Sequence, residues 1–210
     1  MSGIYYPKPP LPQIDSVTYR LPKNQYVDQV VNKTGIVLHH TVSGSAESVY
    51  NWWLDKSRDS VTRVGTAYVV DKDATIYQMF PDDRWAWHLG RGVDTEDEAR
   101  TIGIEIVSEG GLVPLQGQLL AFYNPKTGRG VPFRDGVEDL GYVWRGYQYF
   151  DAYEFKQIIS VVCLVDYLCD KYQIPRRMYQ DLKTYNPAIK KFEGILTHAQ
   201  VRPDKTDVHP

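Results

Sequence analysis

The chain has 210 residues, with 24 lysines and arginines against 26 aspartates and glutamates and a formal net charge of -2. This length suits a single domain that buries a sizeable core, and we expect a monomer. The near balance of charge excludes a general basic field for nucleic acid or anionic lipid. The sequence also lacks the ~20 consecutive apolar residues of a membrane-spanning helix, so we expect neither nucleic-acid binding nor membrane insertion.

The N-terminal segment, residues 1–33, is rich in proline and tyrosine. This composition predicts an extended arm on the domain surface, with a disordered arm as the alternative. Residues 34–210 are then expected to form the one folded domain. The chain does not begin with a basic segment followed by an apolar run, so we predict no signal peptide and synthesis in the cytoplasm.

The first predicted strand covers residues 36–40, a short apolar run that ends in two histidines. Such a run is typical of a buried strand that delivers its last side chains to a cleft. Because successive strand side chains point to opposite faces, we expect only one of His39 and His40 to face a metal ion bound in the cleft.

A helix and a hairpin are predicted next. Residues 45–57 follow a serine that suits an N-cap, and they predict the helix. We expect its adjacent tryptophans, Trp52 and Trp53, in the core rather than against a ligand. Residues 67–70 and 75–80 predict the hairpin, because aspartate and lysine interrupt two β-branched and aromatic runs.

Residues 101–107 predict another strand, in which three isoleucines alternate onto one face. Glu105 then lies on the opposite face. Glutamate is depleted in strands and is rarely buried without a partner. We therefore expect a charged group close to Glu105.

Residues 108–150 mix glycine, proline and aromatic residues without a clear period. This pattern predicts a long loop insertion that contains one hairpin, and insertions of this length are often functional. The aromatic side chains could stack on a sugar or a peptide. Alternatively, they anchor the loop to the domain.

The clearest helix is predicted for residues 151–172, where apolar residues recur at spacings of three and four and a proline at position 175 ends the pattern. The expected core face consists of Phe155, Ile158, Ile159, Val162, Val165 and Cys169. Cys163 and Cys169 lie on poorly matched faces, about 9 Å apart along the axis. We expect two buried thiols and no disulfide.

Histidine and aspartate residues near both ends of the chain could hold one zinc ion. The candidates are His39 or His40, then His198, and finally Asp207. Three protein ligands leave the fourth tetrahedral position to water, which distinguishes a catalytic zinc from a structural one. The residues alone therefore predict a zinc amide or ester hydrolase. His209 could be a distal ligand or an exposed side chain.

Five motifs, in order along the chain, resemble the zinc-dependent N-acetylmuramoyl-L-alanine amidases. This family includes phage lysins and bacterial cell-wall recycling amidases, and it shares its fold with peptidoglycan recognition proteins. The resemblance implies a single α/β domain with a central mixed β-sheet flanked by helices. The motifs are residues 36–41, 64–73, 84–90 and 102–105, and His198 with Lys205-Thr206-Asp207.

The resemblance also assigns roles to individual residues. It places the metal ligands at His39, His198 and Asp207, where relatives may carry cysteine at the third position. It matches Glu105 to the general base that recycling-type amidases use on the zinc-bound water. Lys205 fits a cation that stabilises the developing oxyanion.

The substrate-binding residues are expected around the same site. His40, Trp87 and His88 are expected beside the substrate groove, although a core histidine bonded to the backbone is the alternative for His88. Thr66 falls where some phage relatives carry a catalytic tyrosine. We therefore expect Glu105, rather than a tyrosine, to carry the proton transfer.

The implied reaction is hydrolysis of the amide bond between N-acetylmuramic acid and L-alanine, in peptidoglycan or in soluble muropeptides. One alternative is a non-catalytic peptidoglycan-binding or regulatory module of the same fold. Another is a zinc endopeptidase that cuts within the stem peptide. A phage lysin would act on the cell wall after its release, whereas a recycling enzyme would act in the cytoplasm.

Overall fold

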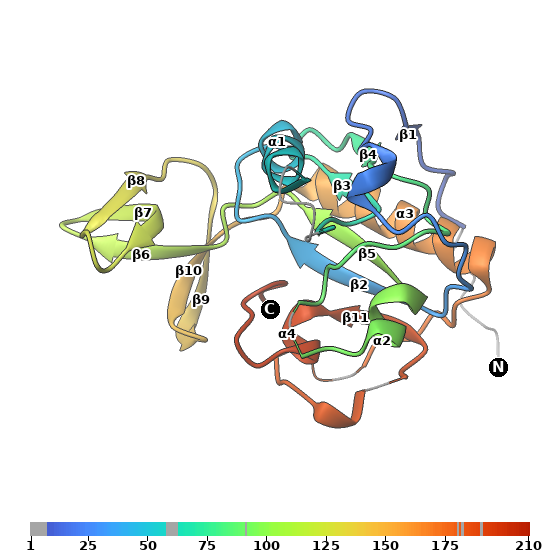
Figure 1. Cartoon of the computed structure of the whole chain (residues 1–210). Helices are drawn as coiled ribbons and strands as arrows, with labels where there is room; N and C mark the ends of the chain where they lie inside the picture. The colour runs from blue at the N-terminus through green and yellow to red at the C-terminus, as the bar shows by residue number, and fades with distance from the viewer. Residues whose placement is uncertain (1–7, 58–62, 91, 180, 182, 190) are drawn as a thin grey trace.

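The computed structural model describes residues 8–57, 63–90, 92–179, 181, 183–189 and 191–210, so residues 1–7 of the expected arm lie outside it. A mixed sheet with the strand order β1-β4-β3-β5-β2-β11 forms the centre of the molecule (Figure 1). Its strands are β1 (Ile14–Asp15), β2 (Gly35–His40), β3 (Tyr68–Val70), β4 (Ile76–Gln78), β5 (Thr101–Ile106) and β11 (Gly194–Thr197).

Strands β3, β5, β2 and β11 are mutually parallel, whereas β3 and β4 form the predicted antiparallel hairpin. The parallel strands consist mainly of buried residues, as expected for a sheet that is covered on both faces. The predicted α/β class with a central mixed sheet is confirmed. Strand β1 pairs in parallel with β4, so the described part of the N-terminal segment extends the sheet.

Helices cover the sheet: α1 (Ala46–Ser57), α2 (Thr95–Arg100), α3 (Phe155–Tyr172) and α4 (His198–Val201), with 3-10 turns η1 (Lys23–Gln25) and η2 (Pro187–Ile189). Helix α3 lies behind the sheet in Figure 1, and α1 lies above it. Both helices contribute to one core, in which Trp53 and Leu164 pack with Ile36 and Ile104 of the sheet. No described helix has the length and apolar content needed to cross a membrane.

The buried face of α3 differs from the prediction. Phe155 is 78% exposed, and Ile158, Ile159 and Val162 are exposed too. Of the expected face, Cys169 is buried and Val165 packs against the core while partly buried. The buried residues of the helix are Gln157, Val161, Cys163, Leu164, Leu168 and Cys169. Both sets recur at helical spacing, so periodicity alone cannot choose between two apolar faces. The prediction of two buried free thiols is confirmed.

Residues 108–150 also differ from the prediction, because they form a second sheet rather than a loop. We call it the accessory sheet; it projects from the body (Figure 1) and is antiparallel, with the order β8-β7-β6-β10-β9. Its strands are β6 (Gly111–Leu115), β7 (Gln118–Asn124), β8 (Arg129–Pro132), β9 (Val137–Trp144) and β10 (Tyr147–Asp151). Most of β8 and β9 is exposed. Strands that are exposed along most of their length need no apolar alternation, so β8 and β9 carry no strand period in the sequence.

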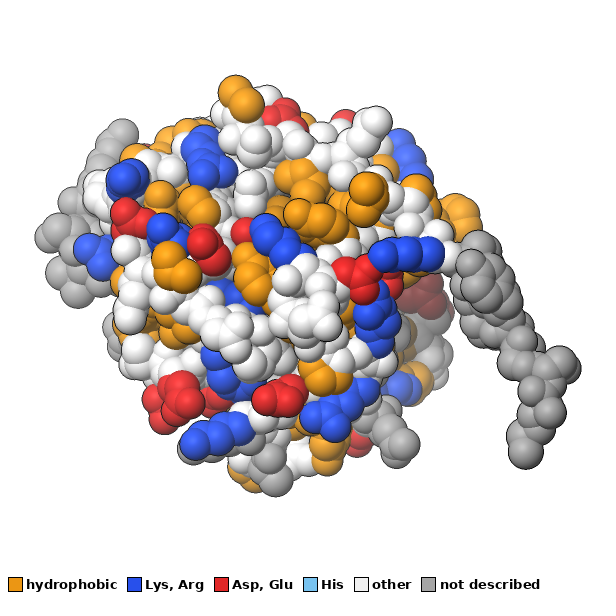
Figure 2. Space-filling view, turned by 90° about the vertical axis from the view of Figure 1, so that its right-hand side faces the viewer, with side chains coloured by type: hydrophobic (Ala, Val, Ile, Leu, Met, Phe, Trp, Pro, Cys, Tyr) orange, Lys and Arg blue, Asp and Glu red, His pale blue; other side chains and the backbone are white. Residues whose placement is uncertain are grey.

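Acidic and basic side chains are mixed on the surface. On the face shown in Figure 2, Lys and Arg side chains lie among Asp, Glu and apolar side chains, and neither sign of charge forms a broad patch. This face therefore offers no general electrostatic surface for a polyanion.

Candidate functional site

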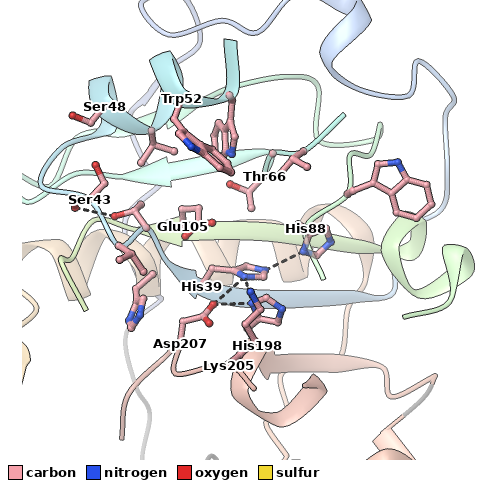
Figure 3. A pocket seen from close by; sticks show the side chains of 18 residues that line it. His39, Ser43, Ser48, Trp52, Thr66, His88, Glu105, His198, Lys205 and Asp207 are labelled. Atoms are coloured by element: carbon pink, nitrogen blue, oxygen red, sulfur yellow. Dashed lines mark hydrogen bonds and ion pairs between the residues drawn. The ribbon is translucent and has the colours of Figure 1, made fainter. Parts of the chain in front are cut away.

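A cavity of about 570 Å³ opens where the parallel strands end at their carboxyl ends (Figure 3). Strand β2 contributes His39 and β5 contributes Glu105, while His198 directly follows β11. The C-terminal segment contributes Lys205 and Asp207. Ligand sites commonly form at this edge of a parallel sheet, because loops diverge there.

Strand register brings the three sheet-derived side chains into one row. His39 lies opposite Glu105 on the neighbouring strand, and Leu38 lies opposite Thr197. The next residue after Thr197 is His198, which therefore emerges beside His39. Since laterally paired residues project from the same face of a sheet, both imidazoles and the Glu105 carboxyl point into the cavity.

His39, His198 and Asp207 form a buried cluster, and their ligand atoms lie within 4.8 Å of one another. The Nδ1 atoms of the two histidines are 2.9 Å apart. Oδ2 of Asp207 lies 3.2 Å from Nδ1 of His39 and 2.8 Å from Nδ1 of His198. Figure 3 shows the three side chains pointing toward one another. His40 lies outside this cluster.

Hydrogen bonds behind the cluster fix the orientation of His198. Its Nε2 lies 3.0 Å from the carbonyl oxygen of Leu89. A carbonyl can only accept, so Nε2 carries the proton. In the neutral ring, Nδ1 then presents a lone pair to His39 and Asp207. This arrangement is typical of metal-binding histidines, whose second nitrogen is held by a backbone or carboxylate oxygen.

A longer chain of hydrogen bonds fixes His39. The Thr101 hydroxyl donates to the Asp97 carbonyl (2.6 Å) and must therefore accept the bond from Nε2 of His88 (3.0 Å). Nδ1 of His88 is then the acceptor for Nε2 of His39, at 3.0 Å. As a result, Nδ1 of the neutral His39 also carries a lone pair that faces the cluster.

The charge states agree with these bonds. Burial, together with the neighbouring His198, lowers the pKa of His39 to about 4. Burial also holds the pKa of His88 well below its usual value, so both rings are neutral near pH 7. Burial acts to raise the pKa of Asp207, but the adjacent imidazoles outweigh it, and the pKa lies well below its usual value.

The residues therefore fit a metal ion. Two imidazole lone pairs and one carboxylate oxygen converge at distances at which they would repel one another without a cation. Two nitrogens and one oxygen form an accepted zinc ligand set that leaves a fourth position open. Among the described residues, this is the one group found with metal-binding geometry.

Glu105 lies beside the cluster without a hydrogen-bonding partner for its buried Oε2 among the described residues. Burial raises the pKa of this carboxyl well above its usual value, and the charge of Asp207 adds to the effect. The charge of Lys205 acts in the opposite direction, but no ion pair joins Lys205 to Glu105 among the described residues. Both residues line the same cavity.

The four expected substrate-binding residues all line this cavity. His40 is near the Tyr153 hydroxyl, at 3.3 Å, and points away from the metal cluster. The Thr66 hydroxyl donates to the backbone of Tyr68, at 2.9 Å. Both ring nitrogens of His88 are engaged by side chains, so His88 holds His39 rather than being bonded to the backbone. Trp87 lies beside the cavity and contacts Trp85 edge to face, with ring centroids 5.1 Å apart.

Gly103 allows Thr66 and His88 to cover strand β5. A Cβ atom at this position would lie 2.7 Å from Cγ2 of Thr66 and 3.0 Å from Nδ1 of His88. Any side chain would displace one of them. The absence of a side chain at Gly103 therefore allows His88 to lie behind His39.

Sequence reasoning missed other contributors to the site. Trp53 is buried as expected, but its neighbour Trp52 is 52% exposed and lines the cavity. Adjacent helical residues are about 100° apart, so two neighbouring tryptophans rarely face the same core, and this signal was available. The roles of Thr101 and of the Leu89 carbonyl depend on tertiary contacts alone.

A family model described as N-acetylmuramoyl-L-alanine amidase matches residues 29–210. The chain belongs to the N-acetylmuramoyl-L-alanine amidase family. The resemblance of its motifs is thereby confirmed, as is the expected enzyme class of an amidase that acts on peptidoglycan. No curated protein matches the amidase.

Solved structures resemble the amidase in fold. One is N-acetylmuramoyl-L-alanine amidase LysC from Clostridium intestinale URNW, with a TM-score of 0.51 and 19% identity over 95% of this chain and 90% of that chain. Another is the endolysine N-acetylmuramoyl-L-alanine amidase LysCS from the same organism, with a TM-score of 0.50 and 19% identity over 96% and 90% of the two chains. At this identity, the likeness establishes the fold.

Proposed function

We propose that the amidase is zinc-dependent and cleaves the bond between N-acetylmuramic acid and L-alanine. The observation that carries this proposal is the convergence of Nδ1 of His39, Nδ1 of His198 and Oδ2 of Asp207 beside a buried carboxyl. The choice of bond rests on membership of the family. A zinc ion bound there would act as a Lewis acid and would lower the pKa of a water molecule toward ~7.

The residues around this position would carry out proton transfer, stabilise the developing charge and orient His39. Glu105 accepts the proton from the attacking water and then delivers it to the leaving amine, a role that suits a carboxyl with a raised pKa. The Lys205 ammonium stabilises the negative charge that develops on the carbonyl oxygen. His88 holds His39 in the tautomer that presents Nδ1.

We also propose that the substrate is the polymeric cell wall, on which the enzyme would act as a lysin after release. The exposed Trp52 supports this, since its ring stands at the cavity and offers an apolar face for a sugar or peptide. Turnover of intact sacculi is expected to exceed turnover of soluble muropeptides. Preference for the soluble substrate would instead favour the recycling role.

Analysis of digestion products tests the proposed function. Purified peptidoglycan is treated with zinc-loaded protein and, in parallel, with chelated protein, and the fragments are identified by mass spectrometry. We expect new L-alanine amino termini and intact glycan strands with zinc alone. New termini within the stem peptide would indicate an endopeptidase, and zinc binding without cleavage of any wall would indicate a binding module.

The hydrogen bonds of His88 lead to a separate prediction. His88→Gln places an N–H near the position of Nε2 but removes the acceptor for His39. We expect the affinity for zinc to fall by ~10- to 100-fold, the range for loss of a hydrogen-bonding partner that orients a metal ligand. His88→Asn is the matched control, because its side-chain oxygen lies near the position of Nδ1, and its affinity should stay close to that of the wild type.

Competition with a chromophoric chelator measures both affinities. The ¹⁵N shifts of His39 in the zinc-free protein report its tautomer directly. In His88→Gln, a fraction of the His39 rings should carry the proton on Nδ1 instead of Nε2, whereas in His88→Asn the proton should stay on Nε2. Equal zinc affinity in the two variants would contradict the role of His88.

A further inference from the structure

The accessory sheet contacts the segment that carries the catalytic residues through the turn between β9 and β10. Arg145 and Gly146 form this turn, and both have positive φ values, 48° and 91°, as in the type I′ turns of tight hairpins. Trp144 and Tyr147 pair directly across it. In Figure 1 this hairpin is drawn beside the C-terminal segment, and the contacts below establish that they touch.

Arg145 binds the backbone of that segment. Nη1 donates to the carbonyls of Arg202 (3.0 Å), Pro203 (3.2 Å) and Lys205, and Nη2 donates to those of Ala199 (2.8 Å) and Lys183 (3.4 Å). Three of these carbonyls, those of Arg202, Pro203 and Lys205, lie between α4 and Asp207, and the carbonyl of Ala199 lies within α4. The segment after α4 is irregular, so these carbonyls have no regular ladder to satisfy them, and buried carbonyls need a donor. One planar guanidinium supplies several donors in a fixed geometry.

The base of the same hairpin holds the chain on the other side of Asp207. The ring of Phe150 stacks on His209 with centroids 4.6 Å apart, and Tyr153 stacks on the opposite face of His209 at 4.4 Å. Phe150 also packs with Trp144 and Ala199 in a small separate core. The chain is therefore held on both sides of Asp207. Arg145 binds the carbonyl of Lys205, two residues before it, and the aromatic stack holds His209, two residues after it. His209 is consequently buried and does not join the metal cluster.

We propose that the accessory sheet, through Arg145, positions the segment that supplies Lys205 and Asp207. Arg145 is a positioning residue in this proposal, because it acts through the backbone and touches no reacting atom. The proposal rests on the proposed function for the roles of Lys205 and Asp207. In this proposal, the insertion at 108–150 holds residues 202–207, which belong to neither a helix nor a strand.

The substitution Arg145→Lys tests the proposal, since lysine keeps the charge but cannot reach several carbonyls in the guanidinium geometry. We expect zinc affinity to fall by ~10-fold or more, because Asp207 is no longer held. Amide hydrogen exchange in the zinc-free protein should rise in residues 199–207 and stay unchanged in β2 and β5. Arg129→Lys is the matched control, because Arg129 is an exposed arginine on β8 of the same sheet.

The outcomes separate the possible errors. Wild-type zinc affinity and wild-type exchange in Arg145→Lys would overturn the proposal. Faster exchange throughout the central sheet would also overturn it, because Arg145 would then support folding in general. If the wild type binds no zinc but exchange in Arg145→Lys rises in residues 199–207 alone, the positioning role stands and the proposed zinc chemistry fails.

Discussion

Replacing His198 by alanine is expected to abolish zinc binding and amide hydrolysis together. Nδ1 of His198 lies 2.9 Å from Nδ1 of His39 and 2.8 Å from Oδ2 of Asp207, so it is close to both other atoms of the proposed ligand set. Removing one of three protein ligands should cost far more affinity than the ~10- to 100-fold loss that follows from removing a hydrogen-bonding partner of a ligand. Metal analysis of the purified variant and measurement of L-alanine amino termini would check both effects.

His40→Ala is the control for this experiment. His40 is a buried histidine beside a proposed ligand, but it lies outside the metal cluster. We expect this variant to keep one zinc ion per chain, whatever its effect on substrate. A His198→Ala protein that retains one zinc ion and normal turnover would refute the ligand assignment.

The sequence was sufficient to predict the candidate ligands because they are encoded locally. Strand β2 is a continuous apolar run, and its final residues must emerge at the sheet edge, which limits the choice to His39 or His40. The same reasoning placed Glu105 on a strand face and led us to expect a charged group beside it. The structure brings these residues into one cavity, where register selects His39 rather than His40.

The features that escaped prediction depend on tertiary structure. The chain from His39 through His88 to Thr101 joins residues of three segments, and spacing along the sequence gives no sign of it. The buried face of α3 could not be selected because two apolar faces compete. The accessory sheet lacks apolar alternation, although its two-residue turns, Gln116-Gly117 and Arg145-Gly146, were a readable hairpin signal.

Glu105 is the second residue for which we expect a large effect, and the reason is its isolation. Oε2 is buried without a hydrogen-bonding partner among the described residues, which costs free energy in the folded protein. A purely structural carboxyl would be expected to have its hydrogen bonds satisfied. Glu105 lines the cavity beside the proposed metal position, so proton transfer is the task that best accounts for its carboxyl.

Glu105→Gln is therefore expected to lower kcat by ~100-fold or more, because the amide cannot accept the proton. The variant should keep one zinc ion per chain and fold at least as stably, since it removes a buried ionisable group with a raised pKa. Glu109→Gln is the control, because burial also raises the pKa of Glu109 but this residue does not line the cavity. Turnover, metal content and thermal unfolding of both variants measure these effects. Unchanged turnover in Glu105→Gln would assign the proton transfer to another group.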